Sequence, residues 1–158
     1  MKNALIEHAD SSIIAVSFAH DQTDAQVIAN AALHFPGSTV IGESDPATLP
    51  SWRFRDCWRC SGKTVTVDMA LAGAQRLTEI RLERDTILFA TDSLWLRANE
   101  RRDDLARAAL ESKRQVLRDV PQMLLGKMPL DGVVCKALLS DCRTTDELES
   151  LVPAWPEL

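Results

Sequence analysis

The chain lacks several features that would assign it at once to a membrane or secreted class. None of its apolar runs reaches the roughly 18 residues that a membrane-spanning helix needs. The N-terminus has no basic start followed by an apolar stretch, so no secretory signal is visible. Internal repeats and low-complexity tracts are also absent. At 158 residues, we expect one domain, or one small domain with a helical appendage.

An excess of basic charge is also missing, because the net charge is −5. This balance argues against a general affinity for phosphate backbones. The charge is uneven: residues 1–50 carry −5, residues 51–120 carry +3 and residues 121–158 carry −3. Either the segments complement one another within the fold, or a basic helical face docks an acidic partner. The arginines near residue 100 alternate with acids and lack interleaved aromatics, so we expect no nucleic-acid site.

Cysteine and histidine are too sparse for a zinc-site pattern. Cys57 and Cys60 form a C-x-x-C pair, whereas six residues separate Cys135 from Cys142 and no histidine lies near either pair. A redox C-x-x-C normally opens a helix, and this one falls in a predicted strand. We expect buried thiols that act as small apolar groups and no metal. A small metal or redox protein that uses Cys57 and Cys60 is the alternative.

Other catalytic signatures are incomplete. Gly62-Lys63-Thr64 imitates the end of a phosphate-binding loop, but residue 57 is not the required glycine and strand-forming residues follow. None of the serines, cysteines or lysines has a recognisable base beside it. The sequence therefore predicts no enzyme and no cofactor.

The N-terminal part alternates strand and helix signals. Residues 12–18 are β-branched and apolar and predict a strand. Thr23 or Asp24 can cap a short helix over residues 25–33, which Pro36-Gly37 ends. A second strand is expected over residues 38–42.

Residues 43–50 predict a loop because they contain two prolines. Residues 52–60 predict an extended segment, followed by a turn at 61–63 and a strand at 64–67. One face of the extended segment would carry Phe54, Asp56 and Trp58. We expect this hairpin to join the N-terminal sheet, because an isolated two-stranded ribbon is barely stable.

After Asp68, a good N-cap, the spacing of the apolar residues changes to that of a helix. An apolar stripe about seven turns long then recurs at steps of three and four, with a possible kink near Thr91. It consists of Met69, Gly73, Leu77, Ile80, Arg84, Ile87, Leu88, Leu94 and Trp95.

After a polar turn, a second helix is predicted from about residue 103 to residue 119, ended by Pro121. Its expected stripe is Leu105, Ala108, Ala109, Ser112 and Val116. These small residues, with Gly73 and Ala74 on the first helix, would permit close approach of the backbones. We therefore expect an antiparallel helical hairpin.

Beyond Pro121, residues 132–140 predict one helical segment, and Thr144 with Glu147 forms a capping box for another. The expected fold is α+β: a small N-terminal β-sheet with one helix, a long helical hairpin and a short helical C-terminal tail. The expected divisions are residues 1–67, 68–121 and 122–158.

Tryptophan is enriched at protein interfaces. We expect Trp58 in the core and Trp95 on the helical stripe. Trp155 lies between prolines near the end of the chain, so it is the best candidate for a partner contact. The expected partner-binding residues are Trp155, Trp95, Arg97 and Arg101.

Four short motifs follow one another in the middle of the chain: Phe54-Arg55-x-x-Trp58, Val67-Asp68-Met69, Arg81-x-x-Arg84-Asp85 and Gln115-x-Leu117-Arg118-Asp119-x-Pro121. Their order resembles small tail-associated proteins of tailed bacteriophages, the family usually labelled tail assembly chaperone-like. The likeness covers about residues 12–121. Cys57 and Cys60 depart from it, because a small apolar residue and a non-cysteine are expected there.

This resemblance implies a non-enzymatic role in tail or tail-fibre assembly, exercised through protein–protein contacts. The implied partner is a phage tail or tail-fibre protein, and a homo-oligomer is possible. The chain would act as a chaperone in the host cytoplasm during assembly, or as a minor structural component of the virion tail.

Overall fold

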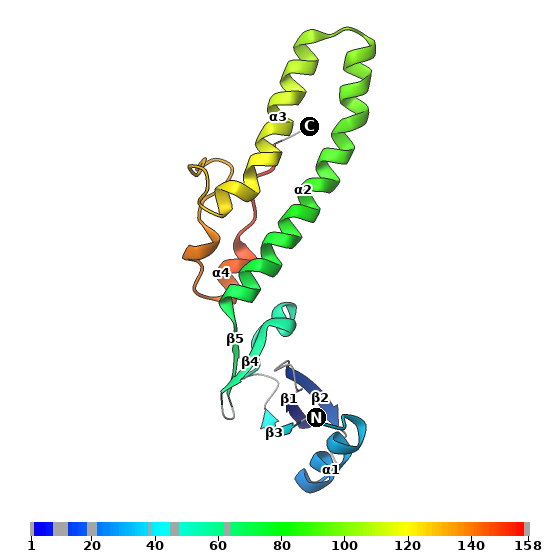
Figure 1. Cartoon of the computed structure of the whole chain (residues 1–158), viewed down its shortest axis with the longest axis vertical. Coiled ribbons are helices and arrows are strands. Elements are labelled where there is room, and N and C mark those ends of the chain that lie inside the picture. The colour runs from blue at the N-terminus through cyan, green and yellow to red at the C-terminus, as the bar shows by residue number, and fades with distance from the viewer. Residues whose placement is uncertain are drawn as a thin grey trace. The chain divides into compact units, whose positions relative to one another are not determined.

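The computed structural model describes residues 2–7, 13–18, 22–37, 39–44, 48–61 and 64–156. The fold is α+β, as expected, with small sheets in the N-terminal part and a long helix pair after them (Figure 1). The chain consists of two compact units, Met1–Ala72 and Gly73–Leu158, and each is described by itself. None of the helices in the described ranges is long and apolar enough to cross a membrane.

A three-stranded antiparallel sheet in the first unit has the order β2-β1-β3. The strands are β1 (Lys2–Glu7), β2 (Ile13–Phe18) and β3 (Thr39–Ser44). The second and third confirm the expected strands, although Ser12 and Ser38 lie outside the described residues. Strand β3 also continues through residues 43 and 44, which were expected to belong to the following loop. The central strand β1 was missed: Leu5 and Ile6 are adjacent and both buried, so its short apolar run shows no alternation.

Helix α1 (Asp24–His34) confirms the expected helix, with Thr23 as its N-cap. The Thr23 hydroxyl accepts from the Gln26 backbone N–H, while the Gln26 side chain accepts from the Thr23 N–H at 2.8 Å. This reciprocal capping box satisfies two donors that the first turn leaves open. Val27 and Ala31, four residues apart, form the buried side of the helix.

The expected extended conformation of residues 52–57 is wrong. They form 3-10 turns, η2 (Trp52–Cys57), with a kink at Phe54, and not a strand that places Phe54, Asp56 and Trp58 on one face. Phe54 and Cys57 are the buried residues of this segment. Trp58 is buried as expected and packs against Trp52, with ring centroids 5.0 Å apart.

Strands β4 (Trp58–Ser61) and β5 (Thr64–Val67) form the expected hairpin. Its expected membership of the N-terminal sheet is wrong, because β4 and β5 form a separate two-stranded sheet. The two sheets instead share a hydrophobic core, which explains how so short a ribbon is stabilised. This core contains Leu5, Ile13 and Trp58, with Leu49, Cys60, Val65 and Val67 packed against it.

Helix α2 (Met69–Glu100) opens on Asp68, whose Oδ1 accepts from the backbone N–H groups of Ala70 and Leu71. The expected kink near Thr91 is absent, because α2 is one helix of 32 residues. Thr91 is fully buried, and its hydroxyl donates to the Leu88 carbonyl oxygen at 2.6 Å. A hydroxyl that bonds back to its own helix does not start a new one.

Helix α3 (Asp104–Leu124) runs antiparallel beside α2, which confirms the helical hairpin (Figure 1). Its expected buried stripe is wrong at four of its five residues: Leu105 is 86% exposed, and Ala108, Ala109 and Ser112 are also exposed. The fifth, Val116, packs against the core as expected. The less exposed side carries Ala106, Leu110, Lys113, Arg114, Leu117, Val120 and Leu124.

The stripe was misplaced because Lys113 and Arg114 occupy the inward side. Both are partly buried, as long charged side chains with aliphatic stems can be. A pattern that counts only apolar residues leaves them out and shifts the expected stripe toward the neighbouring alanines. The expected close backbone approach at Gly73 is also wrong, since nothing lies within 4 Å of a Cβ built there. Ala74 is exposed.

Pro121 does not end α3, contrary to expectation; the helix continues to Leu124. Proline lacks an N–H donor and its ring crowds the carbonyl oxygen four residues earlier, but the Pro121 carbonyl oxygen still accepts from the Leu125 N–H at 3.2 Å. The additional turn buries Met123 and Leu124, which offsets one missing helical hydrogen bond.

The α2–α3 turn is a Schellman motif with a non-glycine residue at its left-handed position. The Asp103 N–H donates to the Ala98 carbonyl oxygen at 2.9 Å, and the Arg102 N–H donates to that of Asn99 at 3.1 Å. Arg102 has φ 56°, the region that glycine adopts most easily.

Arg102→Gly is therefore expected to stabilise the hairpin by about 0.5–1 kcal/mol, the strain that a Cβ causes in this conformation. The measurement is urea unfolding followed by far-ultraviolet circular dichroism, with Arg101→Gly as the control. Arg101 precedes the left-handed position, so its glycine variant should lose stability. A loss of stability in Arg102→Gly would contradict the strain assigned to this turn.

The C-terminal segment packs into the base of the hairpin, in the same core as both helices. Residues 132–140 do not form the expected helix; they form turns that lead into a short 3-10 helix, η3 (Leu139–Asp141). Helix α4 (Thr145–Ser150) has the expected Thr144–Glu147 capping box. The shared core contains Ile80, Val120, Met123, Leu124, Val134, Cys135 and Leu151.

Arg76 holds the end of this segment. Its side chain is only 2% exposed, and Nη2 donates to the Leu151 carbonyl oxygen at 2.9 Å. Nη1 lies 3.1 Å from Glu79 Oε2 and 3.3 Å from Glu83 Oε1. Since the tail and the hairpin share one core and this arginine, residues 122–158 are part of the second unit.

Some sequence predictions fall on positions for which no structure is described. These are the two turn residues Gly62 and Lys63 and residues 45–47 of the expected loop.

Candidate functional site

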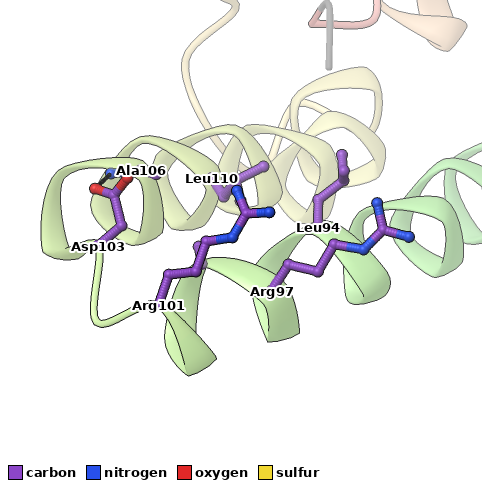
Figure 2. A pocket seen from close by; sticks show the side chains of 7 residues that line it. Leu94, Arg97, Arg101, Asp103, Ala106 and Leu110 are labelled. Carbon is purple, nitrogen blue, oxygen red and sulfur yellow. Dashed lines mark hydrogen bonds between the residues drawn. The ribbon is translucent and has the colours of Figure 1, made fainter.

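A pocket of about 300 Å³ lies at the tip of the hairpin, where the last turns of α2 meet the first turns of α3. Its apolar lining comes from both helices: Leu94 and Ala98 from α2, and Ala106 and Leu110 from α3. The Schellman turn sets this geometry because it ends α2 and starts α3 within three residues, 101–103. Figure 2 shows the pocket residues from close by.

Three charged residues complete the lining: Arg97, Arg101 and Asp103. The two arginines are four residues apart, so they lie one turn apart on the same side of α2. Figure 2 shows the Arg101 side chain reaching toward Leu110. The structure thus brings together two of the four expected partner-binding residues.

The carboxylate of Asp103 is already engaged. Its Oδ1 accepts from the Ala106 backbone N–H at 3.0 Å, and Asp103 is the N-cap of α3. Arg107, the nearby base of α3, lies 2.7 Å from Asp104 Oδ1. Within the described ranges, Arg97 and Arg101 form no ion pair.

A polar contact in the middle of the hairpin fixes the two helices against each other. Arg114 of α3 donates from Nη1 to the buried Thr91 hydroxyl at 3.1 Å and to Asp92 Oδ1 at 2.6 Å. Arg114 is only 17% exposed, so this contact is partly shielded from water. It links α2 and α3 across the hairpin.

The outer side of α2 carries an apolar row that we did not predict: Leu82, Phe89 and Leu96. These residues are 64%, 79% and 53% exposed. Each is seven positions after the one before, so the three lie on one side of the helix. The direction of the side chain around the helix axis changes by about 20° from one to the next.

The row points away from α3. Phe89 precedes the buried Thr91 by two residues, and Leu96 precedes the buried Ala98 by two. Two residues turn an α-helix by about 200°, so the row and the α3-facing residues lie on opposite sides. The sequence does contain a signal for this row, because a large apolar residue recurs there every seven positions. The stronger inward stripe on the same helix obscured it. We call these three residues the outer row.

The two expected tryptophans lie elsewhere. Trp95 is half-buried on α2 and does not line the tip pocket. Trp155 packs against the core at the base of the second unit. Its neighbour Ala154 donates its N–H to the Val134 carbonyl oxygen at 2.9 Å. Trp155 therefore has a packing role within the chain, and we do not retain it as a partner-binding residue.

All four cysteines are in the thiol form. Burial, with the nearby Asp56 and Asp68 carboxylates, raises the pKa of the Cys57 thiol. Burial, with Glu7, likewise raises the pKa of Cys60. An activated cysteine needs a lowered pKa, so this environment gives no support to a redox role for the pair.

Native Cys57 and Cys60 should therefore be alkylated by iodoacetamide several-fold more slowly at pH 7 than the same chain in urea. Because a raised pKa lowers the thiolate fraction, the native rate should increase only as the pH passes the ordinary thiol range. Mass spectrometry of the alkylated peptides measures both rates. Fast native alkylation at pH 7 would contradict the raised pKa values and revive the redox alternative.

Within the part of the chain that the structure describes, no group of three or more His, Cys, Asp or Glu side chains is placed to hold a metal ion. Comparisons with protein-family models, with curated proteins and with solved structures give no match for this chain.

Proposed function

We propose that this chain is a non-enzymatic assembly protein of tailed bacteriophages that binds a tail or tail-fibre protein through the hairpin. The outer row on α2 is the observation that carries the proposal. Single exposed apolar residues are ordinary, but these three recur every seven residues and so form one apolar line along a helical face, against which another helix can pack. The occupant that suits this row is an amphipathic helix of the partner.

Charge favours a different polypeptide over a second copy of this chain. An antiparallel pair of α2 helices centred on Phe89 would place Arg81 of one copy beside Arg97 of the other. A parallel pair in register would place Asp85 beside its own copy. Because like charges across a helical seam are unfavourable, both arrangements oppose self-pairing.

The choice of tail assembly comes from the resemblance of residues 12–121 to the tail assembly chaperone-like family. The confirmed helical hairpin fits the role, because it offers one long side for packing with another protein. A chaperone would cover apolar surface of the partner before assembly. A minor structural component of the virion would keep the same contact in the finished tail.

The test is affinity purification of a tagged copy from phage-producing cells, together with protein analysis of purified particles. A chaperone should retain a tail or tail-fibre protein and be absent from the particles. Presence in the particles at a fixed ratio would instead assign the structural role. Absence from both the particles and any complex with a tail protein would contradict the proposal.

A further inference from the structure

The pocket at the tip of the hairpin is chemically different from the outer row, because an apolar floor lies beside two arginines. Ala98 is buried in the floor, and Leu94 and Leu110 are half-buried. A volume of about 300 Å³ is at the lower end for small-molecule sites and suits side chains rather than a large cofactor.

Arg97 and Arg101 belong, with Arg81 and Arg102, to the four arginines of the hairpin that form no ion pair within the described ranges. Five arginines of the hairpin each lie within 3.3 Å of at least one carboxylate oxygen: Arg76, Arg84, Arg107, Arg114 and Arg118. Arg97 and Arg101 have no such partner in the described ranges. The one carboxylate of the pocket lining, Asp103, is held by its cap to Ala106.

We propose that this pocket binds an acidic side chain and a neighbouring apolar side chain of the partner protein. The carboxylate would accept charge-assisted hydrogen bonds from Arg97 and Arg101, while the apolar side chain would lie against Leu94 and Leu110. The inference rests on the proposed function in one respect, since it takes the occupant to be a segment of protein. A nucleic-acid phosphate would satisfy the arginines but would leave the apolar floor uncovered.

The test uses a library of random dodecapeptides selected for binding to the full chain and, in parallel, to the Arg97→Gln/Arg101→Gln double variant. Peptides selected on the wild type should place Asp or Glu beside Leu, Ile, Val, Met or Phe. The affinity of a selected peptide should fall roughly tenfold for each arginine removed, as expected for hydrogen bonds to charged groups. Changing its acid to the matching amide should cause a similar loss.

Two controls make the result decisive. Arg81→Gln, an exposed arginine outside the pocket, should leave peptide affinity unchanged. A single-stranded oligonucleotide should not compete. The inference is overturned if the wild type and the double variant select the same peptides, if selected peptides lack acids, or if only the oligonucleotide binds.

Failure here is distinguishable from failure of the proposed function. The peptide selection probes Arg97 and Arg101, whereas the purification from phage-producing cells asks only whether a tail protein is bound. If the tail protein binds the double variant as well as the wild type, the pocket inference fails and the proposed function stands.

Discussion

Arg76→Met is expected to destabilise the helical unit by about 1–3 kcal/mol, the cost of leaving a buried hydrogen-bond acceptor without its donor. Arg76 is 2% exposed and is the donor to the Leu151 carbonyl oxygen. Leu151 is only 9% exposed, so its carbonyl would be left largely without water or protein partners. Glu79 and Glu83 are more exposed and can turn toward solvent, so they add less to the loss.

The matched control is Arg81→Met, the same chemical change five residues farther along α2. Arg81 is exposed, so its replacement should change the free energy of unfolding by no more than about 0.5 kcal/mol. Urea unfolding followed by far-ultraviolet circular dichroism measures both variants. Equal stability of the two would show that the Arg76 contacts do not hold the C-terminal segment to the hairpin.

Phe89→Ser is expected to weaken binding of the tail protein by about 2 kcal/mol or more, roughly thirtyfold, because a central aromatic residue commonly dominates an interface. Phe89 lies in the middle of the outer row and is 79% exposed in the chain by itself. Its replacement removes little intramolecular packing, so the unfolding midpoint should change only slightly.

Leu105→Ser is the control for this prediction. Leu105 is also a large apolar residue of the hairpin and is 86% exposed, but it belongs to α3. It should retain the affinity of the wild type in the same titration. A loss of affinity from Leu105→Ser equal to that from Phe89→Ser would mean that general apolar exposure, and not the outer row, mediates the contact.

The elements that could be predicted are those with strong local signals. Thr23, expected together with Asp24 as a possible cap, Thr144 with Glu147, and Asp68 each identified a helix start through a side chain that accepts a backbone N–H. The helical spacing of apolar residues continues over many turns of α2, and this long inward stripe identified the first helix of the hairpin.

The failures come from contacts that a local pattern does not contain. Pro121 lies inside α3 because the last turn buries Met123 and Leu124 against the C-terminal segment, a gain made through tertiary packing. The burial of Arg76 was not predicted, because arginine is rarely buried unless it is paired. Its acceptor, the Leu151 carbonyl oxygen, is 75 residues away in the sequence. Of the candidate site, Arg97 and Arg101 were predicted, whereas the outer row was hidden by a stronger stripe on the same helix.

Photo-crosslinking from residue 89 tests the contact between the outer row and a partner most directly. Phe89 is replaced with the photoreactive p-benzoylphenylalanine, which preserves an aromatic side chain, and the cells that produce the phage are irradiated. We expect a crosslink to a tail or tail-fibre protein, and a much weaker one when the same group replaces Leu105. No crosslink from residue 89, or a crosslink only to a second copy of this chain, would contradict a role in which α2 binds a different polypeptide.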